Sequence, residues 1–158
     1  MASVSRLKQA VKKITGRPAP RLLQVKDAWR LTPNMIRVTF AGPELEGFPE
    51  GRDGGNCKLM IPETGEPRDA VARRLRDGPT PERRTYTVRY YDAAKGELAI
   101  DFVAHGDNGP ASRWANHAAP GSFLGFSGPS TPKLTHFEAD WYLVAADPSA
   151  LPVADAAL

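Results

Sequence analysis

Six short apolar or alternating runs, separated by glycine- and proline-rich turns, constrain the fold of this chain most. The runs cover residues 22–25, 35–41, 58–61, 83–91, 97–104 and 122–127. In the second run Ile36, Val38 and Phe40 share one face, which is typical of a strand with one buried side. Six strands at this spacing, with one brief helix, predict a mainly β fold: a six-stranded antiparallel barrel of Greek-key type.

Composition narrows the class of protein further. A chain of 158 residues is long enough for one domain with a core and short for two, and its net charge of +3 is too small to argue for nucleic acid. Cys57 is the only cysteine, which favours a reducing compartment. No run of roughly 18 apolar residues is present. We therefore expect a cytoplasmic monomer without membrane insertion.

The two ends of the chain differ from the middle. In the N-terminal segment, residues 1–20, an apolar stripe predicts a short docking helix, although the lack of acidic residues before Asp27 also resembles a transit peptide. Near the other end, the continuous apolar run 141–146 predicts a strand covered on both faces, and residues 150–158 predict the start of a helix. A strand that feeds a helix in this way is how a nucleotide-binding α/β domain begins. We expect a barrel over residues 21–134 and the start of a truncated second domain over residues 135–158.

The fourth run, residues 83–91, carries the most chemistry. It contains three arginines, three tyrosines and two threonines. Arginine forks suit phosphate oxygens, and a tyrosine ring can lie against a flat heterocycle. The combination fits a flavin nucleotide, and the alternative is an ordinary amphipathic strand with its charges in water. The polar stretch before it, residues 63–83, predicts an exposed excursion with one helical turn near residues 71–75.

A second segment, residues 105–115, follows directly on the fifth run. Gly106 and Gly109 allow a tight turn, and Pro110 suits the first turn of a helix. The free N–H groups of Ala111 and Ser112 would then form an anion site that suits a diphosphate. The alternative is a surface helix that only packs a tryptophan into the core. No set of residues has the spacing of metal ligands.

These segments carry a resemblance to a known family. The motifs are Arg84-x-Tyr86-Thr87-x-Arg89, then His105-Gly-Asp-x-Gly109-Pro110-Ala111-Ser112-Arg113-Trp114-Ala115, then Ala139-Asp140-Trp141-Tyr142-Leu143. In order and content they resemble the siderophore-interacting protein family, FAD-dependent ferric-siderophore reductases of the ferredoxin-reductase-like superfamily. The similarity runs from about Val25 to the last residue, and the Gly-Pro-Ala-Ser-Arg-Trp-Ala string is its most specific part.

The resemblance implies a role for each matched residue. Arg84 would hold the FAD phosphates with help from Arg89, Tyr86 would stack on the flavin or its ribityl chain, and Thr87 would meet the ring near its reactive N5 as the catalytic residue. Backbone N–H groups and the Ser112 hydroxyl would bind the diphosphate. The remaining cofactor-binding residues would be His105, Gly109, Pro110 and Ala111, although His105 fits a purely structural role equally well. Strict alternation puts Tyr86 and Thr87 on opposite faces, so the flavin would lie across the strand's edge or a bulge.

The implied activity is transfer of a hydride from NADH or NADPH to FAD, and then of single electrons to Fe(III) in a siderophore, which releases Fe(II). The ferric siderophore would be the substrate, and the second domain would bind NAD(P)H. The residues present predict an FAD site without a complete nicotinamide site, so the chain is expected to be a fragment. Three alternatives stay open: another flavin reductase of the superfamily, a non-redox barrel that binds a ligand such as nucleic acid, and a barrel that has lost its cofactor.

Overall fold

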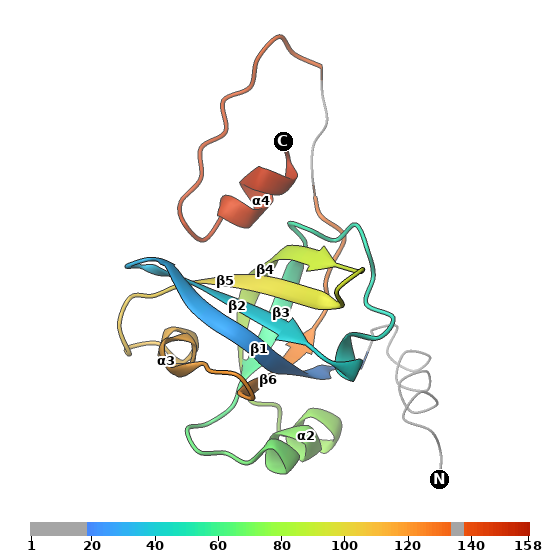
Figure 1. The fold of residues 1–158 in the computed structure, drawn as a ribbon, viewed down its shortest axis with the longest axis vertical. Coiled ribbons are helices and arrows are strands. Elements are labelled where there is room, and N and C mark those ends of the chain that lie inside the picture. The colour runs from blue at the N-terminus through green and yellow to red at the C-terminus, as the bar shows by residue number, and fades with distance from the viewer. Residues whose placement is uncertain (1–18, 134–137) are drawn as a thin grey trace.

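Six antiparallel strands close into a barrel in the computed structural model, which describes residues 19–133 and 138–158 (Figure 1). The strands are β1 (Arg21–Thr32), β2 (Met35–Ala41), β3 (Asn56–Ile61), β4 (Glu82–Asp92), β5 (Glu97–Val103) and β6 (Phe123–Ser127). Their order around the ring is β1-β2-β5-β4-β3-β6. Strands β3, β4 and β5 are successive neighbours, and β6 returns to lie beside β3, which is a Greek key. The predicted barrel is confirmed.

Strand β1 is much longer than the run 22–25 that predicts it. Its first residues pair with β6, and from Gln24 onward it pairs with β2 as far as Thr32. The pairing with β2 shifts register between Val25 and Asp27 and again between Arg30 and Thr32. Because each shift breaks the period of two, alternation alone does not reveal the second half of this strand.

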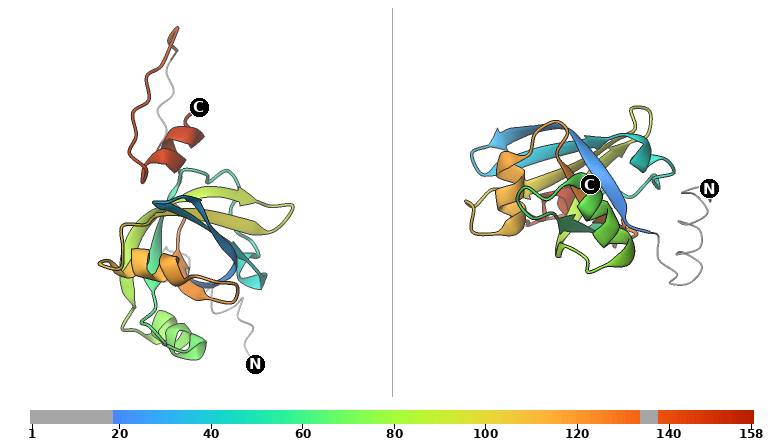
Figure 2. Two further views of the ribbon diagram at one scale, coloured as in Figure 1. Left: turned by 60° about the vertical axis from the view of Figure 1, so that its left-hand side comes forward. Right: turned by 90° about the horizontal axis from the view of Figure 1, so that it is seen from below.

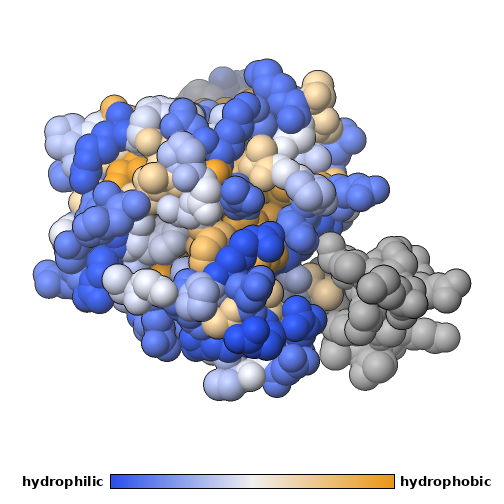
Figure 3. Space-filling view, turned by 60° about the horizontal axis from the view of Figure 1, so that its bottom comes forward, coloured by the Kyte–Doolittle hydropathy of each residue, from blue (hydrophilic) through white to orange (hydrophobic). Residues whose placement is uncertain are grey.

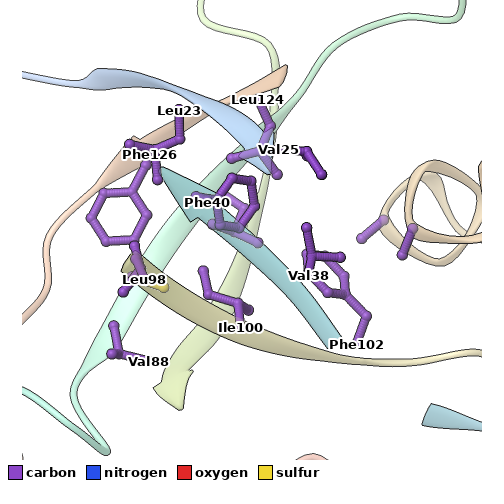
Figure 4. Packing of buried hydrophobic residues seen from close by; sticks show 14 of the residues in the cluster. Leu23, Val25, Val38, Phe40, Val88, Leu98, Ile100, Phe102, Leu124 and Phe126 are labelled. Atoms are coloured by element: carbon purple, nitrogen blue, oxygen red, sulfur yellow. The ribbon is translucent and has the colours of Figure 1, made fainter. Parts of the chain in front are cut away.

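The core fills the inside of the barrel with one inward face from every strand. Phe40, Phe102 and Phe126 are fully buried there, together with aliphatic side chains such as Leu98 and Ile100 (Figure 4). These side chains come from β2, β5 and β6, so the alternation seen in the sequence corresponds to inward and outward faces. The barrel interior is therefore packed with protein side chains, and any ligand site must lie at its edges.

Helices lie at opposite ends of the barrel (Figure 2). They are the short η1 (Pro43–Leu45), α2 (Arg68–Asp77), α3 (Pro110–His117) and α4 (Leu151–Ala156). The described residues contain more helix than the one short helix predicted, and α2 has ten residues where one turn near residues 71–75 is predicted. Val71 is buried, and Leu75 lies so close to Gly125 that a Cβ there would be 2.7 Å from its Cδ2. Tertiary packing of these two residues stabilises a helix whose polar sequence gives little periodic signal.

The C-terminal segment departs from the prediction. Residues 141–146 are not a strand: they run outside the barrel without strand pairing, and Trp141 and Leu143 are 76% and 83% exposed. A strand needs a neighbouring strand to pair with, and the six strands of the described residues pair only with one another in the closed ring. The predicted helix after residue 150 is confirmed as α4. The predicted N-terminal docking helix lies outside the described residues.

Candidate functional site

Strand β4 changes partners halfway along its length, and this change opens a pocket. Residues Glu82 to Thr87 pair with β3, whereas Val88 to Asp92 pair with β5. Beyond the Val88–Ile100 pair, β5 continues along β2 and leaves β4. A pocket of about 570 Å³ lies in the opening, which we call the strand-edge pocket. It is lined by Arg84, Thr85, Tyr86, Thr87, Asp101, Val103, His105, Asp147, Pro148, Ser149 and Pro152.

Four of the predicted site residues meet in this pocket: Arg84, Tyr86, Thr87 and His105. Residues of both faces of β4 reach it because the pocket lies along the edge of the strand. Side chains that alternate between the two faces of β4 can therefore line one pocket. The backbone groups of this half of β4 have no β5 partner across the opening, so they are available to a ligand.

Tyr86 forms an apolar wall of the pocket. Its ring packs against Phe102, with 4.6 Å between the centroids and 40° between the planes. Burial raises the pKa of the Tyr86 phenol to about 12, so the hydroxyl keeps its proton and remains a hydrogen-bond donor at neutral pH. The ring is therefore held in place before any ligand arrives.

Arg84 supplies positive charge at the mouth of the pocket. Its guanidinium donates to the carbonyl of Arg83 at 3.0 Å and is paired with the carboxylate of Glu82. The side chain is 43% exposed, so this pair contributes little to stability and can exchange for another anion. Arg84 is thus the cation best placed to meet a phosphate group.

The loop before α3 is held by Ser112. The backbone N–H of His105 donates to the Ser112 hydroxyl at 3.1 Å, and that hydroxyl donates to the carbonyl of Gly106 at 2.6 Å. The hydroxyl proton predicted to meet a diphosphate is therefore used inside the loop. Helix α3 begins after Gly109 with no side-chain cap, which leaves the N–H groups of Ala111 and Ser112 without one.

Neither Gly109 nor Pro110 lines the strand-edge pocket, but Gly109 lies next to His105, which does. A Cβ at Gly109 would stand 3.3 Å from Cε1 of His105, so a glycine lets the imidazole pack against the start of α3. His105 thus links the pocket to the helix. Ala111 is buried against the core, and Pro110 lies on the opposite side of the helix start, where it lines a second pocket.

Arg89 lies outside the strand-edge pocket, in a different group of charges. Its guanidinium pairs with the carboxylate of Asp155 in α4 and lies 3.7 Å from Asp101. Asp101 also accepts a fork of two hydrogen bonds from Arg37, at 2.7 and 2.8 Å. That fork is the main cause of the raised pKa of Arg37. The group connects β2, β5, β4 and α4 across the outside of the barrel.

Two carboxylates in the lining were missed as site residues. Asp101 faces away from the core between Ile100 and Phe102. In the sequence, the signal for it was Arg37, which occupies the paired outward position on β2. Asp147 lies in the segment before α4, where hydrogen bonds from the Ser149 hydroxyl and then from backbone N–H groups lower its pKa. It is therefore an anion on the wall that faces β4.

Two features are absent from the described ranges, residues 19–133 and 138–158. No three or more histidine, cysteine or acidic side chains are grouped there in a way that could hold a metal ion. No helix in these ranges has both the length and the apolar character needed to cross a membrane.

Comparison with known proteins gives the family of this chain. The model of the siderophore-interacting FAD-binding domain matches residues 24–133. The chain belongs to this family, as the motifs predict.

Individual relatives and a solved structure are similar to this chain in the same way. The chain is 38% identical over 146 residues to the ferric vibriobactin reductase ViuB of Vibrio cholerae. This match covers 88% of this chain and 53% of ViuB. It is 32% identical to the NADPH-dependent ferric-chelate reductase of Escherichia coli, over 84% of this chain and 53% of that protein. A siderophore utilization protein from T. fusca matches with a TM-score of 0.69 and 40% identity, over 87% of this chain and 54% of that one. The chain spans about half the length of the curated relatives it matches.

Proposed function

We propose that this chain is the FAD-binding part of a ferric-siderophore reductase. The observation that carries the proposal is the strand-edge pocket, in which Arg84, Tyr86, Thr87 and His105 meet where β4 leaves β5. Family membership supports the cofactor, and the names of the relatives support ferric iron in a siderophore as the electron acceptor.

The residues present fit a flavin. The pocket has about 570 Å³, one flat aromatic wall, a threonine hydroxyl and open backbone groups along β4. Arg84 lines the pocket, and the uncapped start of α3 lies next to His105 of its lining, so both could hold a phosphate group. An apolar and aromatic wall with donors at one edge is what a flavin ring with its phosphate tail requires.

Each predicted residue receives a role on this basis. Tyr86 forms the wall for the ring or ribityl chain, Thr87 donates a hydrogen bond near N5, and Arg84 binds phosphate oxygens in place of Glu82. The N–H groups of Ala111 and Ser112 bind the diphosphate, while Gly109 and Pro110 shape the helix start beside His105. The pairing of Arg89 with two carboxylates favours a different role for that residue, the attachment of α4.

FAD bound here would supply the redox chemistry, taking a hydride from NADH or NADPH and passing electrons singly to two Fe(III) centres. The protein binds and orients the ring, and Tyr86 and Val103 keep water from part of it. We propose that residues 138–158 begin the NAD(P)H-binding domain, with Asp147 and Ser149 in its first loop. The position of that loop against the strand-edge pocket supports this assignment.

We also propose that the protein works as a cytoplasmic monomer. The buried, unpaired thiol of Cys57 supports a reducing compartment. The ring of described strands has no terminal strand that could extend the sheet into a second copy, which supports a monomer.

The test uses the chain as it is, without relying on a nicotinamide site. FAD-loaded protein is reduced photochemically without air and mixed with a ferric tris-catecholate, while flavin absorbance and Fe(II) captured by a chelator are followed together. The proposal predicts reoxidation of the flavin with about two Fe(II) per FAD, set by the two electrons of the reduced flavin. Stable reduced flavin with no Fe(II), in protein that does hold FAD, would overturn the siderophore assignment.

A further inference from the structure

Two carboxylates line the strand-edge pocket, and they differ in how their charge is balanced. Asp101 accepts two hydrogen bonds from Arg37 and lies 3.7 Å from the guanidinium of Arg89, so two cations offset it. Hydrogen bonds from hydroxyl and backbone N–H groups, rather than a neighbouring cation, lower the pKa of Asp147. Asp147 is therefore an anion whose charge no arginine or lysine of the described residues balances.

The carboxylate of Asp147 is held in one orientation by its own turn. The hydroxyl of Ser149 donates to Oδ1 at 2.6 Å, and the backbone N–H groups of Ser149 and Ala150 donate to the same oxygen at 2.8 and 3.1 Å. Three donors on one oxygen favour the ionised form and oppose rotation of the side chain. The negative charge thus has a fixed place in the wall of the pocket.

Helix α4 holds the loop that carries this carboxylate against the barrel. Asp155 of the helix pairs with Arg89 of β4. A Cβ on Gly54 would lie 2.7 Å from the Cβ of Ala156, so the helix is in close contact with the barrel backbone there. Because Arg89 lies only two residues after Thr87, α4 is attached near the end of the strand-edge pocket that Thr87 lines.

A fixed negative charge in this wall opposes reduction of a flavin in the pocket. Full reduction adds two electrons and one proton to the ring, so the anionic reduced form carries one more negative charge than the oxidised form. A carboxylate in the same pocket repels that added charge, and the ring itself displaces water that would otherwise screen the repulsion. The oxidised flavin is then favoured over the reduced flavin, and the midpoint potential falls.

We propose that Asp147 lowers the midpoint potential of the FAD bound in the strand-edge pocket and so makes the reduced flavin a stronger electron donor. The inference rests on the proposed function. Oxygen ligands hold Fe(III) more tightly than Fe(II) because its charge is higher, so iron in such a chelate is harder to reduce. A donor of low potential suits this acceptor. Asp147 acts through its charge on the flavin and takes no part in the transfer itself.

The test measures the midpoint potential of the FAD-loaded chain by slow anaerobic reduction with xanthine and xanthine oxidase beside a reference dye. Asp147→Asn keeps the size of the side chain and an oxygen that can accept from Ser149, and it removes the charge. We expect the flavin–dye equilibrium to move roughly three- to tenfold toward reduced flavin, which is about 15 to 30 mV upward for a two-electron couple. Asp147→Glu keeps the charge and should stay closer to wild type than Asp147→Asn.

Asp77→Asn is the matched control, because Asp77 is exposed at the end of α2 and lines neither pocket. The face that carries α2 is mostly hydrophilic (Figure 3), and α2 and α4 lie at opposite ends of the barrel (Figure 1). This variant should keep the wild-type potential. Equal potentials in wild type and Asp147→Asn, or an equal shift in Asp77→Asn, would overturn the role of Asp147 and leave the FAD site standing. A wild-type chain that holds no FAD would instead overturn the proposed function.

Discussion

Replacing Arg84 should weaken FAD binding while leaving the free energy of unfolding almost unchanged. Its present partners, Glu82 and the Arg83 carbonyl, are at the surface, so Arg84→Ala should change the free energy of unfolding by less than about 1 kcal/mol. Loss of a charge-assisted bond to phosphate should weaken FAD binding by about 10- to 100-fold. Flavin fluorescence titration and thermal melting measure the two effects. Arg83→Ala, a change at the adjacent exposed arginine that does not line the pocket, is the control and should bind FAD normally.

The buried thiol of Cys57 should make the stability of the fold depend on pH, with lower stability at high pH. Burial raises the pKa of its thiol from 9.0 to about 12 in the folded chain. Between these values the unfolded thiol loses its proton and the folded one keeps it, so stability is full below pH 9 and falls as the pH rises toward 12. Between pH 8 and pH 10, wild type should lose on the order of 1 kcal/mol more than Cys57→Ala in urea unfolding. Equal losses in the two proteins would show that the thiol is not protected.

At the scale of elements, Asp101 should matter more than Asp155 for holding the strands and α4 together. The Asp101 side chain is 8% exposed and accepts two hydrogen bonds from Arg37, whereas that of Asp155 is 60% exposed. Asp101→Ala leaves Arg37 and Arg89 facing each other without their shared anion and should cost about 1–3 kcal/mol in denaturant unfolding. Asp155→Ala should cost less than about 1 kcal/mol. A larger loss of stability in Asp155→Ala than in Asp101→Ala would contradict this, and would mean that the ion pair at α4 stabilises the fold more than the pairs between the strands.

The elements also show what could be predicted from sequence. Strands β2 and β5 alternate without interruption and were predicted closely, whereas bulges hid the second half of β1. The apolar run 141–146 has the composition of a strand, but the described strands pair only with one another in the closed ring, and the run lies outside that ring. The spacing of Val71 and Leu75 predicts one helical turn, whereas the full length of α2 depends on the packing of these two residues against the barrel.

Part of the candidate site was within reach of the sequence. Arg84, Tyr86, Thr87 and His105 were predicted from residue chemistry and motif, and the structure brings them to one pocket. The separation of β4 from β5 that creates this pocket is a property of pairing, which residue types do not encode directly. The hydrogen bonds of the Ser112 hydroxyl within its own loop likewise could not be predicted from residue types.

On the scale of the whole molecule, one strand organises three regions. Glu82 lines the second pocket, which Pro110 also lines, residues 84–87 of β4 line the strand-edge pocket, and Arg89 pairs with Asp155 of α4. The packed barrel holds these regions in fixed relation because its interior is filled by side chains from all six strands (Figure 4). The barrel acts as a rigid frame, and the ligand chemistry lies along its edge.

The most direct measurement is the amount of FAD that stays with the purified chain. Protein incubated with excess FAD is passed through gel filtration, and flavin and protein absorbance are compared in the eluted peak. A ratio near one FAD per chain for wild type, reduced in Arg84→Ala, is the predicted result. Free FAD eluting apart from a protein that melts cooperatively would contradict a flavin site at the edge of β4.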